Sequence, residues 1–142
     1  MPRIDFYLLR SAKFRKREAF VCALCQKIWQ KHRVYIHTEN AARSHQLGDL
    51  LWFFRDDSFL PHVVLPSPLA NKTPVCIGHQ TQTVQDLRPV LINLTPQVPA
   101  FFEQFERIVE VVTLDEPARS QGRERYRTYQ QAGYPPEALT EV

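Results

Sequence analysis

The chain is short of several residue types that common classes of protein need. Its 142 residues include four glycines, too few for a glycine-rich phosphate cradle in addition to ordinary turns. Three cysteines, an odd number, argue against a secreted disulfide framework and favour a reducing cytoplasm. No apolar run approaches the ~20 residues that a membrane-spanning helix needs. Arg3, Asp5 and Arg10 also interrupt any signal-peptide pattern, so the sequence predicts a cytoplasmic protein without membrane contact.

The excess of positive charge is small. Lysine and arginine total 18 against 15 aspartates and glutamates, which gives a net charge of +3 and a pI near 8.9. This excess is too weak to indicate a general nucleic-acid binder, so the distribution of the charges has to decide. The 44% hydrophobic and 23% charged residues are typical of a soluble globular protein, and the length fits one domain.

Short apolar runs alternate with helical patterns along the chain. Residues 14–31 place apolar side chains at helical spacing, Thr38 or Asn40 can cap a second helix, and a short helix is predicted around 101–105. The inward stripe of the second helix is predicted to consist of Leu47, Leu50, Leu51 and Phe54. The predicted strands are residues 4–9, 34–37, 63–65, 75–78, 90–94 and 107–112.

The last helix has the clearest start and stop signals. Thr113 and Glu116 have capping-box spacing, and Pro117 falls in the predicted first turn. The helix is predicted to run to about Ala132, because Gly133 suits a left-handed cap and two prolines follow.

Strands that alternate with helices predict an α/β fold. We expect a single three-layer domain over residues 1–136, with a mostly parallel twisted sheet and helices on both faces. Residues 137–142 are predicted to be a loose tail. The turn after the first strand, residues 10–13, contains no glycine, so we predict that the fold has no phosphate-binding loop.

The chain contains no recognisable catalytic set. Cys22 and Cys25 form a C-x-x-C pair that is open to a redox or zinc interpretation, but their apolar mid-helix setting favours two buried, unreactive thiols. Cys76 is the one further cysteine, and the five histidines are scattered, so a structural zinc site lacks ligands. We therefore predict no catalytic residue, no metal and no cofactor.

One face of the last helix gathers arginines around an aromatic ring. Arginine forks bind carboxylates in a bidentate manner, and an apolar surface beside them suits a short acidic peptide with a hydrophobic end. The alternative is an ordinary solvated arginine face, and Arg125 points elsewhere, towards an internal carboxylate. The face consists of Arg119, Arg123, Tyr126 and Gln130, with Arg127 beside it and Val112 and Leu114 just before the helix.

Two other surfaces have to be weighed. In the run 50–54, Trp52 or Phe53 must face away from the core, and with Phe59 it would form an anchor for another protein, unless the following loop covers it. Residues 10–17 contain five basic side chains, so direct nucleic-acid binding is an alternative function. Because this stretch lacks interleaved surface aromatics for base stacking, general solubility or incidental contact with nucleic acid is the favoured interpretation. A degenerate nucleotide enzyme is a further alternative that rests on the fold alone.

Several stretches form a recognisable series in their order and spacing. They are Asp5-Phe6-Tyr7-Leu8-Leu9, Leu51-Trp52, Ser58-Phe59-Leu60-Pro61-His62, and Arg123-Glu124-Arg125-Tyr126-Arg127-Thr128-Tyr129 ending in Gly133-Tyr134. Together they resemble the chi subunit of bacterial DNA polymerase III, from one end of the chain to the other. The resemblance implies a non-catalytic accessory subunit of the clamp-loader assembly in DNA replication, associated with the replisome in the cytoplasm.

The resemblance also implies two partners. One is the psi subunit, with which chi proteins form a heterodimer, and the matching positions are Trp52 and Phe59. The other is the acidic, phenylalanine-terminated tail of single-stranded-DNA-binding protein, so that contact with DNA is mainly indirect. The positions that match the tail-binding site are Val112, Arg119, Arg123, Tyr126 and Arg127, of which Arg119 and Arg127 replace lysines of the family.

Overall fold

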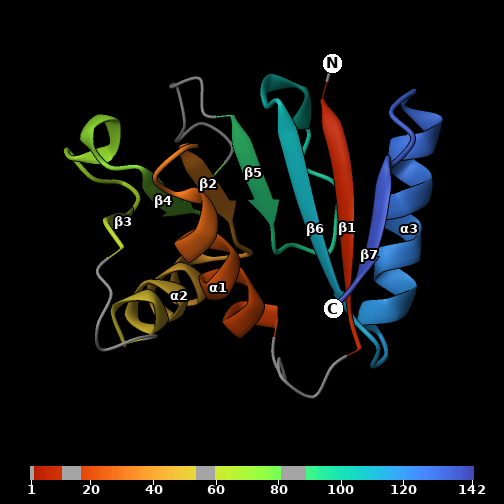
Figure 1. The fold of residues 1–142 in the computed structure, drawn as a ribbon, viewed down its shortest axis with the longest axis horizontal. Helices are drawn as coiled ribbons and strands as arrows, with labels where there is room; N and C mark the ends of the chain where they lie inside the picture. Colours follow the sequence, from red (N-terminus) through yellow and green to blue (C-terminus); the bar gives the residue numbers. More distant parts are fainter. Residues whose placement is uncertain (1, 11–16, 54–59, 81–88) are drawn as a thin grey trace.

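A seven-stranded sheet, in which every pair of neighbouring strands is parallel, forms the centre of the protein (Figure 1). The strand order is β3-β4-β2-β5-β6-β1-β7. The computed structural model describes residues 2–10, 17–53, 60–80 and 89–142. The strands are β1 (Arg3–Leu9), β2 (Val34–His37), β3 (His62–Val64), β4 (Val75–Gly78), β5 (Val90–Asn93), β6 (Arg107–Thr113) and β7 (Ala138–Glu141).

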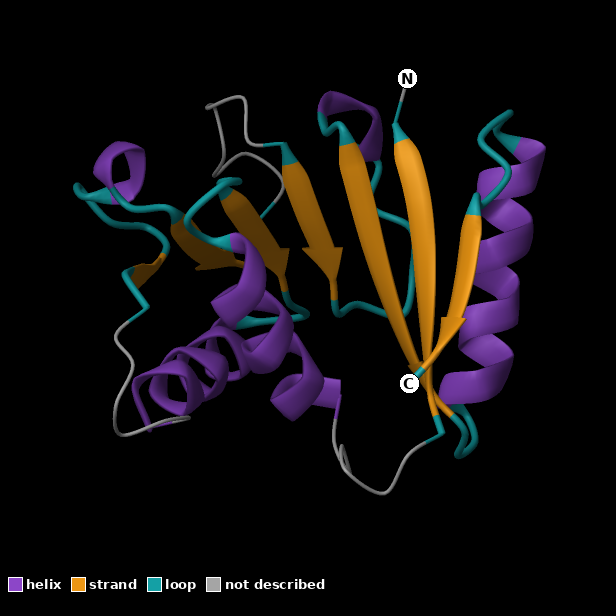
Figure 2. Ribbon diagram, viewed as in Figure 1, coloured by secondary structure: helices purple, strands orange, loops and turns teal. Residues whose placement is uncertain are grey.

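Helices cover both faces of this sheet, which confirms the predicted three-layer α/β fold (Figure 2). Helices α1 (Arg17–Ile28) and α2 (Ala41–Phe53) lie on one face. Helix α3 (Ala118–Gln131) lies on the other face, beside β1 and β7 at one edge of the sheet. Two short 3-10 helices, η1 (Ala70–Lys72) and η2 (Phe102–Gln104), complete the described elements, and η2 stands where a helix around 101–105 is predicted.

The central strands are buried on both sides. In β2, Val34 and Ile36 pack under α1 and α2, whereas Tyr35 packs on the opposite face with the aromatic residues Phe102 and Phe105. Side chains of a strand alternate between the faces, so a strand covered on both faces needs apolar residues at successive positions. The predicted strands 34–37 and 75–78 are therefore confirmed with their boundaries.

Helix α2 confirms one expectation and contradicts another. The Asn40 side-chain oxygen accepts a hydrogen bond from the Arg43 backbone N–H at 2.9 Å, so Asn40 caps the helix. Leu47 and Leu51 are buried, but the predicted inward position of Leu50 is wrong, since 38% of Leu50 is exposed. The buried face is centred instead on Gly48, which brings the helix close to β3; Phe54 lies outside the described residues.

The predicted capping box of α3 is also wrong. The helix begins at Ala118, and Pro117 occupies its N-cap position without a side-chain hydrogen bond. Glu116 instead accepts a hydrogen bond from the Ser120 hydroxyl at 2.6 Å. At the other end the prediction is confirmed, because Gly133 has a φ of 91°, the left-handed conformation that glycine adopts without strain.

The predicted loose tail over residues 137–142 is wrong. Residues 138–141 form β7, which pairs with β1 and closes one edge of the sheet. Backbone hydrogen bonds hold this strand at both ends: Glu137 N–H donates to the Ile4 carbonyl at 2.9 Å, and Val142 N–H donates to the Leu8 carbonyl at 2.8 Å. β7 brings side chains close to α3, and the site below depends on them.

A buried carboxylate joins α3 to the sheet. Glu110 of β6 is fully buried and accepts hydrogen bonds from Arg125 Nε at 2.7 Å, the Tyr129 hydroxyl at 2.7 Å and Asn93 Nδ2 at 2.8 Å. Burial raises the pKa of Glu110, and the Arg125 guanidinium and the two other donors oppose that shift. This contact confirms that Arg125 points to an internal carboxylate.

Replacing this carboxylate should destabilise the protein strongly. Glu110→Gln keeps the volume but leaves the buried Arg125 charge uncompensated, so we expect the free energy of unfolding to fall by about 3–5 kcal/mol in urea denaturation. Glu103→Gln is the control, because Glu103 is an exposed acceptor for the Tyr134 hydroxyl and should matter little. A loss from Glu110→Gln no larger than that of the control would contradict this role.

Candidate functional site

A groove of about 220 Å³ lies between α3 and the edge of the sheet formed by β1 and β7. Its floor is apolar, its α3 wall carries two arginines, and its β7 wall carries a leucine. The lining residues are Phe6, Leu8, Arg10, Val112, Leu114, Arg119, Gly122, Arg123, Tyr126 and Leu139. The structure thus brings together four of the five residues matched to a tail-binding site: Val112, Arg119, Arg123 and Tyr126.

The spacing of residues along α3 explains its groove face. Arg119, Arg123 and Tyr126 are separated by four and three positions, which places them on neighbouring turns of one helix face. Tyr126 is half-buried, and its ring packs on Phe6 with 5.2 Å between the ring centroids. The aromatic ring is therefore fixed in the floor, while the two arginines remain exposed at its rim.

Gly122 allows α3 to approach β6 closely. A Cβ atom at this position would lie 2.8 Å and 2.9 Å from the two methyl carbons of Val112, closer than side chains tolerate. Gly122 is buried in the middle of the helix, where glycine is otherwise unfavourable. The close approach sets the depth of the groove at Val112.

The two arginines on the α3 wall of the groove are not neutralised by ion pairs within the described residues. Neither Arg119 nor Arg123 has an ion pair among the described residues. Glu116, just before α3, is exposed, and its pKa is lowered chiefly by the hydrogen bond from Ser120 and further by the charges of Arg123 and Arg119. The groove can therefore accept carboxylates from a ligand.

Arg127 is placed differently from the other matched residues. It does not line the groove, and its guanidinium pairs with Glu124 of the same helix at 3.0 Å. Both side chains are largely exposed, so this pair is weak and Arg127 can exchange partners at the surface.

Helical spacing could not identify the rest of the groove. Phe6, Leu8 and Arg10 come from β1 and its end, and Leu139 comes from β7. Leu139 lies opposite Phe6 in the parallel register, so both side chains point to the α3 face of the sheet. Because residues 138–141 are predicted to belong to a loose tail, the sequence does not predict that β7 forms one wall of the groove.

A second exposed surface lies at the end of α2. Trp52 is 55% exposed and Phe53 is 81% exposed, which confirms that aromatic side chains here face away from the core. The Trp52 ring contacts His62 edge-on at 5.1 Å, and His62 is held between the carbonyls of Leu60 and Gly48. Phe59 lies outside the described residues.

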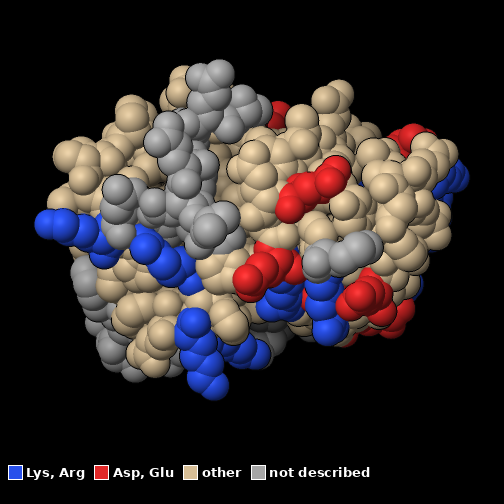
Figure 3. Space-filling model, turned by 90° about the horizontal axis from the view of Figure 1, so that it is seen from above, with Lys and Arg blue, Asp and Glu red and all other residues tan. Residues whose placement is uncertain are grey.

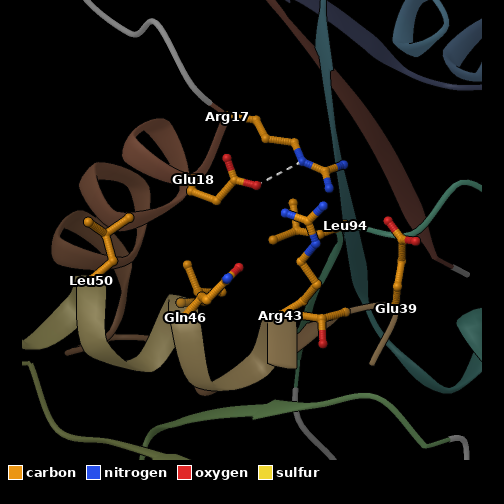
Figure 4. A pocket seen from close by; sticks show the side chains of 9 residues that line it. Arg17, Glu18, Glu39, Arg43, Gln46, Leu50 and Leu94 are labelled. Carbon is orange, nitrogen blue, oxygen red and sulfur yellow. Dashed lines mark hydrogen bonds and ion pairs between the residues drawn. The ribbon is translucent and has the colours of Figure 1, made fainter. Parts of the chain in front are cut away.

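A larger cavity of about 370 Å³ opens at the carboxyl ends of the strands, between the starts of α1 and α2 (Figure 4). Ligands of α/β proteins commonly bind at such an edge, where successive connections leave for opposite faces. Arg17 and Arg43 point into this cavity, but Glu18 and Glu39 lie beside them, and Arg17 pairs with Glu18 at 3.2 Å. The described charges of this lining balance, unlike those of the α3 groove.

Basic and acidic side chains are also mixed at the amino ends of the strands. Seen from above, they lie side by side in the centre of this face (Figure 3). At the starts of β1 and β6, Arg3 and Arg107 both donate to the buried Asp5 carboxylate, at 3.0 Å and 2.8 Å. The described residues in this part of the surface therefore form no uniformly basic track for a nucleic acid.

The other sequence candidates have ordinary structural surroundings. Cys22 and Cys25 are buried in α1 as predicted, and burial raises the pKa of Cys22 to about 12 and that of Cys25 as well. In residues 10–17, Arg10 pairs with Glu141 and Arg17 with Glu18, and Lys13, Arg15 and Lys16 lie outside the described residues. Within the described ranges, no group of three or more histidine, cysteine or acidic side chains is placed to hold a metal ion.

Comparison with known proteins identifies the family. The family model described as DNA polymerase III chi subunit, HolC, matches residues 1–137. The chain belongs to the DNA polymerase III chi subunit family. A DNA polymerase III subunit chi of Pseudomonas aeruginosa is 34% identical over 136 residues, covering 95% of this chain and 94% of the relative. The subunit chi of Haemophilus influenzae is 28% identical over 131 residues, covering 92% and 91%.

Membership of the chi family gives the chain an accessory role in DNA replication, as a subunit of the polymerase III complex. The fold is more widespread than the family. The crystal structure of T4 UvsW matches with a TM-score of 0.67 at 9% identity, and this chain spans 41% of that one. This likeness concerns the fold alone. No helix in the described parts of the chi-family chain has the length and apolar character needed to cross a bilayer.

The close approach of α3 to β6 in this chi-family member can be tested by a pair of substitutions. Gly122→Ala should destabilise the protein by about 1–3 kcal/mol, because the added methyl group overpacks against Val112. In a Val112→Ala background the same change should be neutral or stabilising by up to about 1 kcal/mol, because alanine is the better helix former. Urea denaturation of the four variants measures this, and an equal effect in both backgrounds would contradict the contact.

Proposed function

We propose that the protein is a non-catalytic bridge within the clamp-loader assembly. The α3 groove binds the acidic tail of single-stranded-DNA-binding protein, and the exposed end of α2 binds the psi subunit. DNA is reached mainly through the tail-bearing protein, at the replisome in the cytoplasm. The family membership supports this setting, since it places the chain in the polymerase III complex.

The observation that supports the tail-binding proposal is that two arginines without ion pairs line the same groove as an apolar floor. Arg119 and Arg123 have no ion-pair partner among the described residues, and Phe6, Leu8 and Val112 line the same groove. A peptide with several carboxylates and an apolar end fits both features at once, whereas a nucleic acid would not use the apolar floor in this way. Arg127, at the outer side of the helix, would contact the same carboxylates after leaving Glu124.

The psi-binding proposal is supported by the exposure of Trp52. An aromatic side chain that is more than half exposed and backed by a rigid neighbour, here His62, is typical of an interface anchor. Phe53 enlarges the same apolar surface. With Phe59, which the resemblance adds, these side chains would form the contact with psi.

Removing one arginine or the aromatic ring should weaken tail binding. For Arg123→Ala and for Tyr126→Ala we expect a loss of about 1.5–3 kcal/mol in binding free energy, the range of hydrogen bonds to charged groups. Fluorescence titration with an aspartate-rich peptide ending in phenylalanine measures the loss. Arg43→Ala is the matched control, because it removes an exposed arginine from the other cavity.

Unchanged affinity in both groove variants would reject the tail-binding site. Affinity should also fall as salt is raised, because exposed charge pairs are screened. If instead bare single-stranded DNA bound the wild-type protein tightly without the tail-bearing protein, direct nucleic-acid binding through residues 10–17 would be the better explanation.

The two binding surfaces should be separable by mutation. Trp52→Ala should abolish or strongly reduce co-purification with psi, because a central aromatic anchor is lost, and should leave tail-peptide affinity unchanged. Arg123→Ala should show the opposite pattern, so each variant is the control for the other. Retention of psi by Trp52→Ala would reject the proposed psi surface and leave the tail-binding proposal untouched.

A further inference from the structure

The groove contains a third arginine that does not belong to α3. Arg10 directly follows β1 and lines the same groove as Arg119 and Arg123. Unlike those two, Arg10 has an internal partner: its Nε lies 2.9 Å from Glu141 Oε1 of β7. The side chains of Arg10 and Glu141 are 51% and 61% exposed, so the pair lies at the surface of the groove.

The backbone fixes both members of this pair beside the groove. Arg10 N–H donates to the Val142 carbonyl, and Val142 N–H donates to the Leu8 carbonyl, both at 2.8 Å. Glu141 pairs with Leu8 in the parallel register, two positions after Leu139. Side chains two apart on a strand point to the same face, so Leu139 and Glu141 both face the groove side.

Glu141 therefore gives Arg10 the same chemical group that an acidic ligand would bring. An exposed arginine–carboxylate pair is worth less than about 1 kcal/mol, since water competes for both groups. A ligand carboxylate that is also held by Arg119 or Arg123 has an advantage over Glu141, because its position is fixed by several contacts at once. The exchange needs only side-chain movement, since both backbones are hydrogen-bonded in place.

We propose that Arg10 is a third carboxylate-binding residue of the groove and that Glu141 occupies it as an internal competitor until an acidic peptide binds. This inference rests on the proposed tail-binding function and adds to it an internal carboxylate, Glu141, that lowers the affinity of the groove for acidic peptides. Carboxylates that reach Arg10 gain binding, whereas a peptide with too few acidic residues leaves the Arg10–Glu141 pair intact. The pair thus makes the groove selective for densely acidic peptides.

A double-mutant cycle tests the proposal with a fluorescent peptide rich in aspartate and ending in phenylalanine. Glu141→Gln should lower the Kd about two- to fivefold, because Arg10 no longer has an internal partner. Arg10→Gln should raise the Kd by a similar factor. In the Arg10→Gln background, Glu141→Gln should have little further effect, because the competition it removes no longer exists.

Glu18→Gln is the matched control for the change of net charge. It breaks another Arg–Glu contact, with Arg17 at 3.2 Å, outside the α3 groove. The proposal is overturned if Glu141→Gln lowers the Kd no more than Glu18→Gln does, or if it does so equally with and without Arg10. Thermal melts check that the variants are folded. A second measurement uses the wild-type protein, so that the test does not depend on the variants alone.

That measurement is the side-chain NMR signal of Arg10. In 15N-labelled wild-type protein, saturation with the peptide should shift the Arg10 Nε–Hε resonance together with those of Arg119 and Arg123. An unmoved Arg10 signal beside shifted Arg119 and Arg123 signals overturns this inference alone. If none of the three moves and Arg123→Ala binds the peptide like wild type, the proposed tail-binding function itself has failed.

Discussion

The position of α3 depends on one buried carboxylate. Glu110 of β6 lies on the face of the sheet that α3 covers, and Arg125 and Tyr129 of α3 donate hydrogen bonds to it. Because these two residues must point inward, the rotation of α3 about its axis is set, and Arg119 and Arg123 are turned to the rim of the groove. Gly122 then lets the helix settle against Val112. The Glu110–Arg125 contact thus fixes the orientation of α3. In some proteins buried ionic groups likewise specify one arrangement of the fold rather than adding to its stability.

Much of the sheet could be predicted from the sequence, because its central strands are covered on both faces. Strands 34–37 and 75–78 are continuous apolar runs, and their boundaries are confirmed. There is a physical reason why β7 could not be predicted. It is held by backbone hydrogen bonds to β1, while its largest side chain, Leu139, is 58% exposed. A strand that buries neither face has no need for alternating apolar and polar residues, which is the pattern by which strands are recognised in a sequence.

The same difference applies to the site. The α3 wall follows from a local rule, since residues three and four apart share a helix face, and this rule selects Arg119, Arg123 and Tyr126. Arg10 and Leu139 belong to the same groove only because β1 and β7 pair, across nearly the whole length of the chain. Arg127 shows the limit of the local rule, because it adjoins this face yet lies outside the groove and pairs with Glu124.

The strand order has a consequence for the distance between the two surfaces. α2 packs on β3 and β4 at one edge of the sheet, whereas α3 packs on β6 near the other edge and on the opposite face. With neighbouring strands about 4.8 Å apart, the seven-stranded sheet is roughly 29 Å wide. The sheet lies between the two surfaces, so molecules bound at both would be held apart by about its width. The packed path from one surface to the other runs through the strands and through α1, which contacts both α2 and β6.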